Sequence, residues 1–391
     1  MIKWAFIIKT NSNHNAMKKN LIIFGTRPEA IKMAPLVKAF QKNNNAFATK
    51  VCITAQHREM LDQVLSFFEI TPDYDLDLMK PNQNLYTLTA DIITGLKTVL
   101  DEFKPDFVYV HGDTTTTMAA SIAAFYSGAQ VCHVEAGLRT FDKRSPFPEE
   151  INRSIAGRIS DYHFAPTETS KLNLINENIS SKSIIVTGNT VIDALNYSAS
   201  KVTSNRFKDP EIENLKSVVD TTQKIILVTG HRRENHGEGF INICKALKQI
   251  AKNHPEFNII YPVHLNPNVQ KPVYELLDSV TNIKLINPLS YPAFVWLMEK
   301  AYLIITDSGG VQEEAPSLGK PVLVMRDTTE RPEAVDAGTV LLVGTNTEKI
   351  ISETKRLIEN KQAYESMSRL HNPYGDGKAC ERIVNHILNI K

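Results

Sequence analysis

Short apolar runs alternate with longer stretches of mixed apolar and polar residues along most of the 391-residue chain. The short runs are rich in β-branched side chains and bounded by polar residues, which indicates buried strands. The longer stretches repeat their apolar positions at helical spacing. Strands and helices in such alternation are typical of parallel sheets with helices on both faces, so the pattern predicts an α/β fold.

The alternation occurs in two halves, separated by a polar and weakly periodic stretch over residues 201–224. We therefore predict two Rossmann-like, doubly wound domains facing a cleft, over residues 18–195 and 196–375. A last helix at 378–390 could pack at several places, and we expect residues 376–391 to join the first domain. The predicted strands are 21–24, 50–54, 107–110, 130–134, 162–165 and 184–187 in the first half, and 225–229, 258–261, 283–286, 303–306, 321–325 and 340–343 in the second.

The segment before the first strand does not fit this pattern. Its apolar run, residues 4–8, is too short for a membrane span or a signal-peptide core, and no small-residue cleavage site follows it. Met17 stands shortly before the first strand and could be the true start. We expect residues 1–17 to be a disordered upstream segment.

Composition and charge exclude several classes of partner. Lys and Arg number 44 against 43 Asp and Glu, so no broad basic surface is available for nucleic acid or anionic lipid. The four cysteines lie far apart and form no CxxC pair, which favours reduced thiols. We expect a cytoplasmic protein with neither a nucleic-acid nor a membrane partner.

Polar residues are concentrated where predicted strands end. In open α/β sheets, ligands bind beyond the carboxyl ends of the strands, so these positions indicate the binding site. Such residues stand at 25–29, 111–114 and 135–139 in the first half, and at 230–234, 264 and 307–310 in the second.

Ser308, Gly309 and Gly310 follow a predicted strand and open a helix. Bare glycine amides together with the helix dipole would attract a phosphate group. The alternative is that the paired glycines merely permit a tight strand-to-helix turn. Glu314 lies one turn later, where an acidic side chain could reach a ribose diol.

Three cationic side chains are candidates for contacts with a diphosphate. Arg27 and Lys32 flank a helix-start proline, on the first turns of a helix that points toward the cleft. Lys32 could instead pair with Glu29 on the helix surface. Arg331 is the third candidate, since guanidinium groups suit bidentate oxyanion recognition.

Asp113, Glu135 and Glu149 follow two strands and begin a helix of the first domain, so three carboxylates could converge on one pocket. Such clustering separates the pKa values of acid and base groups. Each also has a structural alternative: Asp113 as a helix cap, Glu135 as a partner of Arg139, and Glu149 as a first-turn dipole charge. His231 stands in a charged strand-end loop, where it could bind phosphate, move protons or simply be solvated.

Two kinds of motif are missing from the sequence. No G-x-G-x-x-G follows a predicted strand, which argues against NAD. No P-loop is present and the histidines lack metal-ligand spacing, which argues against phosphoryl transfer and zinc chemistry. We therefore expect neither NAD nor a metal as cofactor.

Six motifs of the chain are long and therefore specific. They are FGTRPEAIK at 24–32, VHGDTTTT at 110–117, HVEAGLR at 133–139, GHRRE at 230–234, TDSGGVQEEAP at 306–316 and RDTTERPE at 326–333. In these motifs, and from about Lys18 to the C-terminus, the chain closely resembles the bacterial non-hydrolysing UDP-N-acetylglucosamine 2-epimerases.

The resemblance implies glycosyltransferase-B architecture, a homodimer, and synthesis of UDP-N-acetylmannosamine from UDP-N-acetylglucosamine for surface polysaccharides. It also assigns roles to particular residues. UDP would be held by Arg27, Lys32, His231, Ser308, Gly309, Gly310, Glu314 and Arg331, with Phe294 beside the uracil. Catalysis would fall to Asp113, Glu135, Glu149 and His231, and a second, regulatory UDP-N-acetylglucosamine would contact Gln56, Arg232 and His264.

The proton on carbon 2 of this substrate is not next to a carbonyl group, so a side chain cannot remove it directly. Without NAD, elimination of UDP and its return through 2-acetamidoglucal is the expected route. Rival interpretations are a hydrolysing epimerase that releases N-acetylmannosamine and UDP, and a glycosyltransferase of the same architecture. A catalytically silent nucleotide-sugar sensor is a further rival, which the presence of all three carboxylates disfavours.

Overall fold

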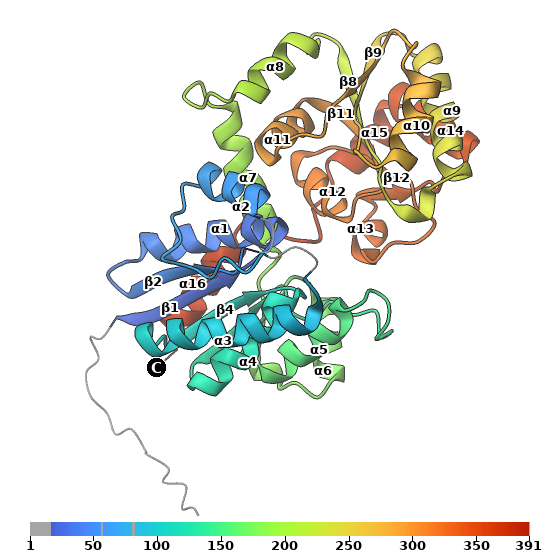
Figure 1. The fold of residues 1–391 in the computed structure, drawn as a ribbon. Helices are drawn as coiled ribbons and strands as arrows, with labels where there is room; N and C mark the ends of the chain where they lie inside the picture. The colour runs from blue at the N-terminus through green and yellow to red at the C-terminus, as the bar shows by residue number, and fades with distance from the viewer. Residues whose placement is uncertain (1–16, 56–57, 80–82, 391) are drawn as a thin grey trace, which may run out of the picture.

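The computed structural model describes residues 17–55, 58–79 and 83–390. Within these residues the strands form two parallel sheets, one of seven strands and one of six, with helices on both faces (Figure 1). This confirms the predicted α/β class with two Rossmann-like units. Of the expected disordered segment, residues 1–16 lie outside the described residues.

The first sheet has the order β3-β2-β1-β4-β5-β6-β7. Helices α1, α2, α7 and α16 pack on one face, and α3 and α4 on the other. Its strands are β1 (Lys18–Phe24), β2 (Phe47–Ile53), β3 (Tyr74–Asp75), β4 (Phe107–His111), β5 (Gln130–Val134), β6 (Tyr162–Ala165) and β7 (Ile184–Val186). The helices of this N-terminal domain are α1 (Arg27–Lys42), α2 (Arg58–Phe67), α3 (Leu85–Phe103), α4 (Thr115–Ser127), α5 (Glu149–Ile159), α6 (Glu168–Asn176), α7 (Thr190–Thr203) and α16 (Ala379–Leu388).

The second sheet has the order β10-β9-β8-β11-β12-β13, which repeats the order of the first. Its strands are β8 (Lys224–Thr229), β9 (Phe257–Pro262), β10 (Ile283–Ile286), β11 (Ala301–Thr306), β12 (Val322–Val324) and β13 (Val340–Leu342). The helices of this C-terminal domain are α8 (Pro210–Val218), α9 (Glu238–Asn253), α10 (Pro267–Leu277), α11 (Tyr291–Lys300), α12 (Gly309–Glu314), α13 (Pro332–Asp336), α14 (Thr347–Glu359) and α15 (Lys361–Ser368).

All twelve predicted strands are present, with ends that shift by a few residues. The strand that the pattern missed is β3, whose two residues are too few to show a periodicity. Every residue of β4 is buried, as expected for a parallel strand covered on both faces. Among the described residues, no helix is both long and apolar enough to cross a bilayer.

The polar stretch between the halves is more ordered than its pattern indicates. It contains the end of α7 and all of α8, which buries Ile212 and Leu215. Asp209 caps α8 by accepting from the backbone N–H of residue 211 at 2.9 Å, so a capping signal was present in the sequence. The boundary placed between residues 195 and 196 falls inside α7 and stays a prediction.

The C-terminal helix α16 lies against the N-terminal domain, beside α1 and β1 (Figure 1). Asp193 of α7 accepts hydrogen bonds from the first backbone N–H groups of α16, those of Ala379 at 3.1 Å and Cys380 at 2.9 Å. At the other end, Lys18 donates to the carbonyl oxygen of Ile387 at 2.6 Å. The chain therefore crosses between the domains a second time.

A buried carboxylate joins the two loops at the point where the strand order reverses in each sheet. In the N-terminal domain, Glu29 accepts from the backbone N–H of Thr26 after β1 (2.7 Å) and from the hydroxyl of Thr114 after β4 (2.6 Å). In the C-terminal domain, Asp307 after β11 accepts from the backbone N–H groups of His231 (2.9 Å) and Arg232 (2.8 Å) after β8. The same device fixes both switch-point loops.

We expect Glu29→Gln to lower the free energy of unfolding by about 1.5–3 kcal/mol, because a buried charged acceptor of several hydrogen bonds is lost. Urea denaturation measures this change. Glu168→Gln is the matched control, since Glu168 also stands in the first turn of a helix but forms an exposed ion pair with Lys171. It should change the free energy of unfolding by less than about 1 kcal/mol. Equal effects of the two substitutions would contradict the bridging role of Glu29.

Candidate functional site

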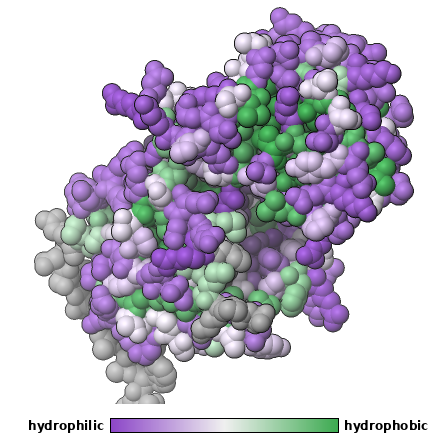
Figure 2. Space-filling model, turned by 45° about the horizontal axis from the view of Figure 1, so that its top comes forward, coloured by the Kyte–Doolittle hydropathy of each residue, from purple (hydrophilic) through white to green (hydrophobic). Residues whose placement is uncertain are grey.

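The carboxyl-end loops of the two sheets meet across the domain boundary, where Figure 2 shows a hollow in the molecular surface. Lys32 of α1 marks the meeting point, because its Nζ lies 3.5 Å from Glu313 Oε2 of α12 in the other domain. The same Nζ donates a hydrogen bond to Glu135 Oε2. One ammonium group therefore contacts a carboxylate from each domain.

Glu135 is a largely buried carboxylate, with 10% of its side chain exposed and a positive backbone φ of 60°. Burial alone would raise its pKa, but the ammonium of Lys32 and the nearby His111 hold that pKa well below its usual range. Burial would likewise lower the pKa of Lys32, yet Glu135 and Glu313 keep it above its usual value. The pair is ionised in the folded protein.

Two local alternatives considered for these residues are wrong. Lys32 does not pair with Glu29, because Glu29 is occupied by the switch-point loops and Lys32 turns toward Glu135. Glu135 does not pair with Arg139 either, because Arg139 binds Glu177 of the helix α6 end, with Nη2 at 2.9 Å from Oε2. In both cases a distant partner replaces the near one.

Charges alternate from Lys32 into the C-terminal domain. Glu313 accepts from Arg331 Nε at 2.8 Å, and Arg331 Nη1 lies 2.8 Å from Glu330. Burial would raise the pKa of Glu330, but Arg331 and Arg326 bring it down to about 2. We call Lys32, Glu313, Arg331 and Glu330 the alternating charge chain. Its contacts place Arg331 at the domain boundary.

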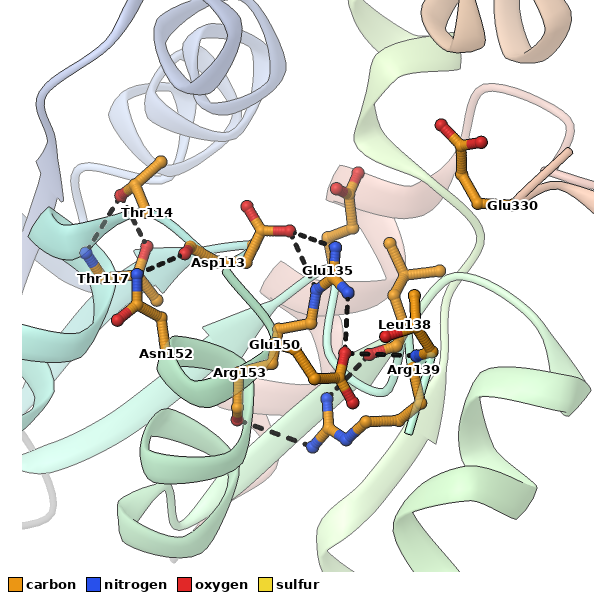
Figure 3. A network of polar contacts seen from close by, with 12 residues as sticks. Asp113, Thr114, Thr117, Glu135, Leu138, Arg139, Glu150, Asn152, Arg153 and Glu330 are labelled. Atoms are coloured by element: carbon orange, nitrogen blue, oxygen red, sulfur yellow. Dashed lines mark hydrogen bonds and ion pairs between the residues drawn. The ribbon is translucent and has the colours of Figure 1, made fainter. Parts of the chain in front are cut away.

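Figure 3 shows a second network, in which Arg153 of α5 reaches between Asp113 and Glu150. Arg153 Nε donates to Asp113 Oδ2 at 2.8 Å, and Nη1 donates to Glu150 Oε2 at 3.0 Å. The alternative of Asp113 as a helix cap is wrong, since Thr114 caps α4. Asp113 is held by a guanidinium group instead.

Glu149 begins α5 and is half-buried. Among the described residues it has no hydrogen-bond or ion-pair partner, unlike its neighbour Glu150. The three predicted carboxylates thus differ in their partners. Glu135 pairs with Lys32, Asp113 pairs with Arg153, and Glu149 is unpaired within the described part of the chain.

The loop after β8 carries His231 and Arg232, and His264 lies opposite it in the loop after β9. The rings of His231 and His264 stack with centroids 5.4 Å apart, and His231 Nδ1 lies 3.5 Å from Asp307. Partial burial lowers the pKa of His231, against the opposing effect of Asp307. Arg232 Nη2 lies 3.4 Å from Glu330, which ties this loop to the alternating charge chain.

The glycine pair opens α12 as predicted, with Ser308 in the capping position. Gly309 is packed against the guanidinium of Arg331, so that a Cβ at this position would lie 2.6 Å from Arg331 Nη1. At Gly310 the nearest atom to such a Cβ is 3.9 Å away. Gly309 is therefore required for the close approach of Arg331, while Gly310 is not.

Arg27, Glu314 and Tyr291 form the remaining part of the site. Tyr291 donates to Glu314 Oε1 at 3.2 Å, and Arg27 is near enough to both for its charge to act on them. Burial raises the pKa of Glu314 from 4.5 to about 7. Phe294, on the same helix α11 as Tyr291, is partly buried against the core.

Some expectations fall beyond what the structure covers. Gln56 lies outside the described residues. Within residues 17–55, 58–79 and 83–390, no group of three or more His, Cys, Asp or Glu side chains is arranged to hold a metal ion.

The structure adds site residues that the sequence pattern did not single out. They are Glu313, which neutralises two cations, Arg153, which holds Asp113, and Asn189, which donates to Glu135 Oε2 at 2.9 Å. Glu313 adjoins Glu314 in a strand-end motif, so its position gave a signal. Asn189 follows the predicted strand 184–187, so its position gave a signal as well, whereas Arg153 lies inside α5 and gave none.

A family model described as UDP-N-acetylglucosamine 2-epimerase matches residues 38–388. A Yersinia pestis protein of that name is 60% identical over 371 residues, which cover 95% of this chain and 98% of that protein.

The chain is also similar to solved structures of UDP-GlcNAc 2-epimerases. The UDP-GlcNAc 2-epimerase from Neisseria meningitidis bound to UDP-GlcNAc is 57% identical, with a TM-score of 0.86 over 95% of this chain and 100% of that chain. The Methanocaldococcus jannaschii UDP-GlcNAc 2-epimerase in complex with UDP-GlcNAc and UDP is 36% identical, with a TM-score of 0.76 over 95% of this chain and 99% of that one.

The raised pKa of Glu314 predicts a pH-dependent stability. In the unfolded chain Glu314 loses its proton near pH 4.5, whereas the folded protein retains it to about pH 7, so stability falls as pH rises through this window. Glu314→Gln removes that loss. Its free energy of unfolding relative to wild type should grow by about 3 kcal/mol across the window and then stay constant.

Urea denaturation at a series of pH values measures this difference. Tyr291→Phe is the companion variant: it removes a hydroxyl that lowers the pKa of Glu314, so the upper end of the window should move to higher pH. A Gln-minus-wild-type difference that does not vary with pH would contradict the raised pKa.

Proposed function

The chain belongs to the UDP-N-acetylglucosamine 2-epimerase family, and from this premise we propose that it interconverts UDP-N-acetylglucosamine and UDP-N-acetylmannosamine without hydrolysis. The observation that carries the proposal is the largely buried Glu135, whose charge is balanced by Lys32 while its Oε1 accepts no hydrogen bond from the described residues. A carboxylate with one anchored and one free oxygen suits proton transfer at a fixed point.

The first step breaks the bond between carbon 1 and the phosphate oxygen, and the bonding electrons leave with UDP. Lys32, Arg331 and Arg27 are the cations that would stabilise the charge developing on the diphosphate. Lys32 would then be shared between the diphosphate and Glu135. As the ammonium turns to the diphosphate, Glu135 loses its counter-charge and its pKa rises, so substrate binding itself makes Glu135 a better base.

The second step removes the proton from carbon 2. Glu135 accepts this proton through Oε1, and the electron pair of the carbon–hydrogen bond forms the double bond of 2-acetamidoglucal. A carboxyl group of Asp113 or Glu149 then returns a proton to the opposite face of carbon 2, and a phosphate oxygen of UDP bonds again to carbon 1. His231, stacked at the edge of the loop, donates to the diphosphate or moves a proton.

UDP itself would be bound mainly by the C-terminal domain. The backbone of Ser308, Gly309 and Gly310 offers amides to a phosphate, and Arg331 adds a charge-assisted contact beside them. Glu314 would accept from the ribose hydroxyls and Phe294 would flank the uracil.

The remaining features of the proposal come from the family. We propose that neither NAD nor a metal takes part, that the protein forms a homodimer in the cytoplasm, and that it supplies surface polysaccharide synthesis. Arg232 and His264 would contribute to a regulatory site for a second UDP-N-acetylglucosamine.

Incubation with UDP-N-acetylglucosamine in heavy water tests this reaction. Elimination and return should give UDP-N-acetylmannosamine that carries deuterium at carbon 2, with no added NAD or metal, as measured by NMR and mass spectrometry. Glu135→Gln should slow the exchange by at least about a hundredfold, because the amide cannot take up the proton. Glu168→Gln, on the exposed face of α6, is the control and should leave the exchange unchanged.

Other products decide against the proposal in different ways. Free N-acetylmannosamine and UDP would identify a hydrolysing enzyme. An epimerised product without deuterium would exclude elimination.

A pair of glycine variants tests the UDP site. Gly309→Ala should displace the guanidinium of Arg331, because the added Cβ would lie 2.6 Å from it, and should weaken UDP binding by about 1.5–3 kcal/mol. Gly310→Ala keeps its backbone amide and places its Cβ 3.9 Å from the nearest atom, so it leaves Arg331 in place and should weaken UDP binding less than Gly309→Ala does. Calorimetry that finds equal UDP affinity in both variants would show that Arg331 does not contact the nucleotide.

A further inference from the structure

All hydrogen bonds that Glu135 receives from the described residues end on a single carboxylate oxygen. Lys32 Nζ and Asn189 Nδ2 donate to Oε2, the latter at 2.9 Å, and His111 Nε2 lies 3.6 Å from the same atom. The buried His111 Nε2 has no hydrogen-bond partner of its own in the described part of the chain. Oε2 is thus anchored, and the anchoring determines where Oε1 points.

Lys32 cannot be the only anchor if it also serves the diphosphate. Its ammonium already contacts both Glu135 and Glu313, and the diphosphate would be a third anionic partner that competes with them. Asn189 is neutral and has no such competing role. It is the donor that can hold Oε2 throughout a reaction cycle.

The amide of Asn189 has only one orientation open to it. Its Oδ1 accepts from the backbone N–H of Val191 at 3.0 Å and so caps α7. The amino group must therefore face the other way, toward Glu135. Asn189 is 3% exposed, so water does not compete for these bonds.

The backbone of Asn189 is tied to the segment by which the chain returns to the N-terminal domain. Its N–H donates to the carbonyl oxygen of Tyr374 at 2.7 Å. The approach is close because Gly188 and Gly375 face each other, both with positive φ, and a Cβ on Gly375 would lie 3.3 Å from Gly188 Cα. Larger residues would force the two backbones apart.

The same returning segment, residues 372–376, also contacts the C-terminal domain. Asn372 Nδ2 donates to the carbonyl oxygen of Glu313 at 2.7 Å, and Tyr374 Oη lies 3.3 Å from Glu333 Oε2. Glu313 is in turn a partner of Lys32 and Arg331. The segment therefore connects the nucleotide side of the site with the residue that holds Glu135.

We propose that Asn189 is a positioning residue for proton transfer: its amide anchors Oε2 of Glu135 so that Oε1 faces carbon 2 of the substrate, and residues 372–376, which contact both domains, hold its backbone in place. The inference rests on the proposed epimerase reaction, in which Oε1 is the atom that accepts the proton from carbon 2. The anchoring itself depends only on the contacts of Asn189.

Asn189→Asp is the sharpest test. The side chain keeps its size and its capping oxygen, but an oxygen replaces the amino group beside Glu135 Oε2. The remaining charged or titratable neighbours of Glu135, namely Lys32, His111 and Arg331, are unchanged. We expect kcat to fall at least about tenfold while KM changes less than about twofold, because binding is retained and orientation is lost. The acid limb of the kcat–pH profile should move to higher pH, because a second carboxylate disfavours the charged form of Glu135.

Asn346→Asp is the matched control. Asn346 also caps a helix through its side-chain oxygen, on α14, and it does not contact Glu135. It should retain wild-type kcat and pH profile. Asn189→Ser is the second test variant, because serine keeps a capping oxygen but cannot reach Glu135, and it should lower kcat with little change in KM.

A measurement on the carboxyl group separates this inference from the proposed function. With 13C-labelled glutamate, the Glu135 carboxyl signal is assigned by its loss in Glu135→Gln, and its titration is compared between wild type and the Asn189 variants. A higher pKa in Asn189→Asp, or in Asn189→Ser should the Asp variant not fold, supports the anchoring. An unchanged titration together with unchanged kcat overturns it. Wild-type protein without epimerase activity would refute the proposed function alone, and the titration would still decide whether Asn189 holds Glu135.

Discussion

The site depends on one largely buried ammonium group that contacts a carboxylate from each domain. Lys32 binds Glu135 in the N-terminal domain and lies 3.5 Å from Glu313 in the C-terminal domain. A buried charge is tolerated only when it is paired, so the loss of either carboxylate would leave Lys32 partly uncompensated. Glu313 also holds Arg331. The balance of charge in the site therefore depends on how the two domains are placed against each other.

Both domains prepare their loops for this contact in the same way. The strand order reverses between β1 and β4 in one sheet and between β8 and β11 in the other, and a buried carboxylate joins the loops at each reversal. Both oxygens of Glu29 and Oδ2 of Asp307 are structural in this sense, because protein donors occupy them, whereas the buried Oδ1 of Asp307 has no hydrogen-bond partner in the described residues. The side chains left to meet a ligand are their neighbours, Arg27 and Lys32 on one side and His231 on the other.

Local alternatives failed at this site for a common reason. Lys32 with Glu29, and Glu135 with Arg139, are pairs that helical or loop spacing allows, yet each partner is used elsewhere. A surface pair of this kind contributes little free energy, so a buried partner supplied by the fold outweighs it. The sequence pattern did not indicate the linker helix α8. It buries only Ile212 and Leu215, and so few apolar positions among polar residues show no clear helical periodicity.

The sequence by itself determined twelve of the thirteen strands in the described residues, their order along the chain, and the polar motifs that follow them, because apolar periodicity and turn chemistry are local properties. It also indicated Ser308 to Gly310 as the start of a helix after a strand. Only the tertiary structure decided which charges meet. Lys32 and Glu135 are 103 residues apart, and Asn189 reaches Tyr374 through a chain crossing, so their contacts follow from sheet order and domain packing. No pattern over a short window of residues contains that information.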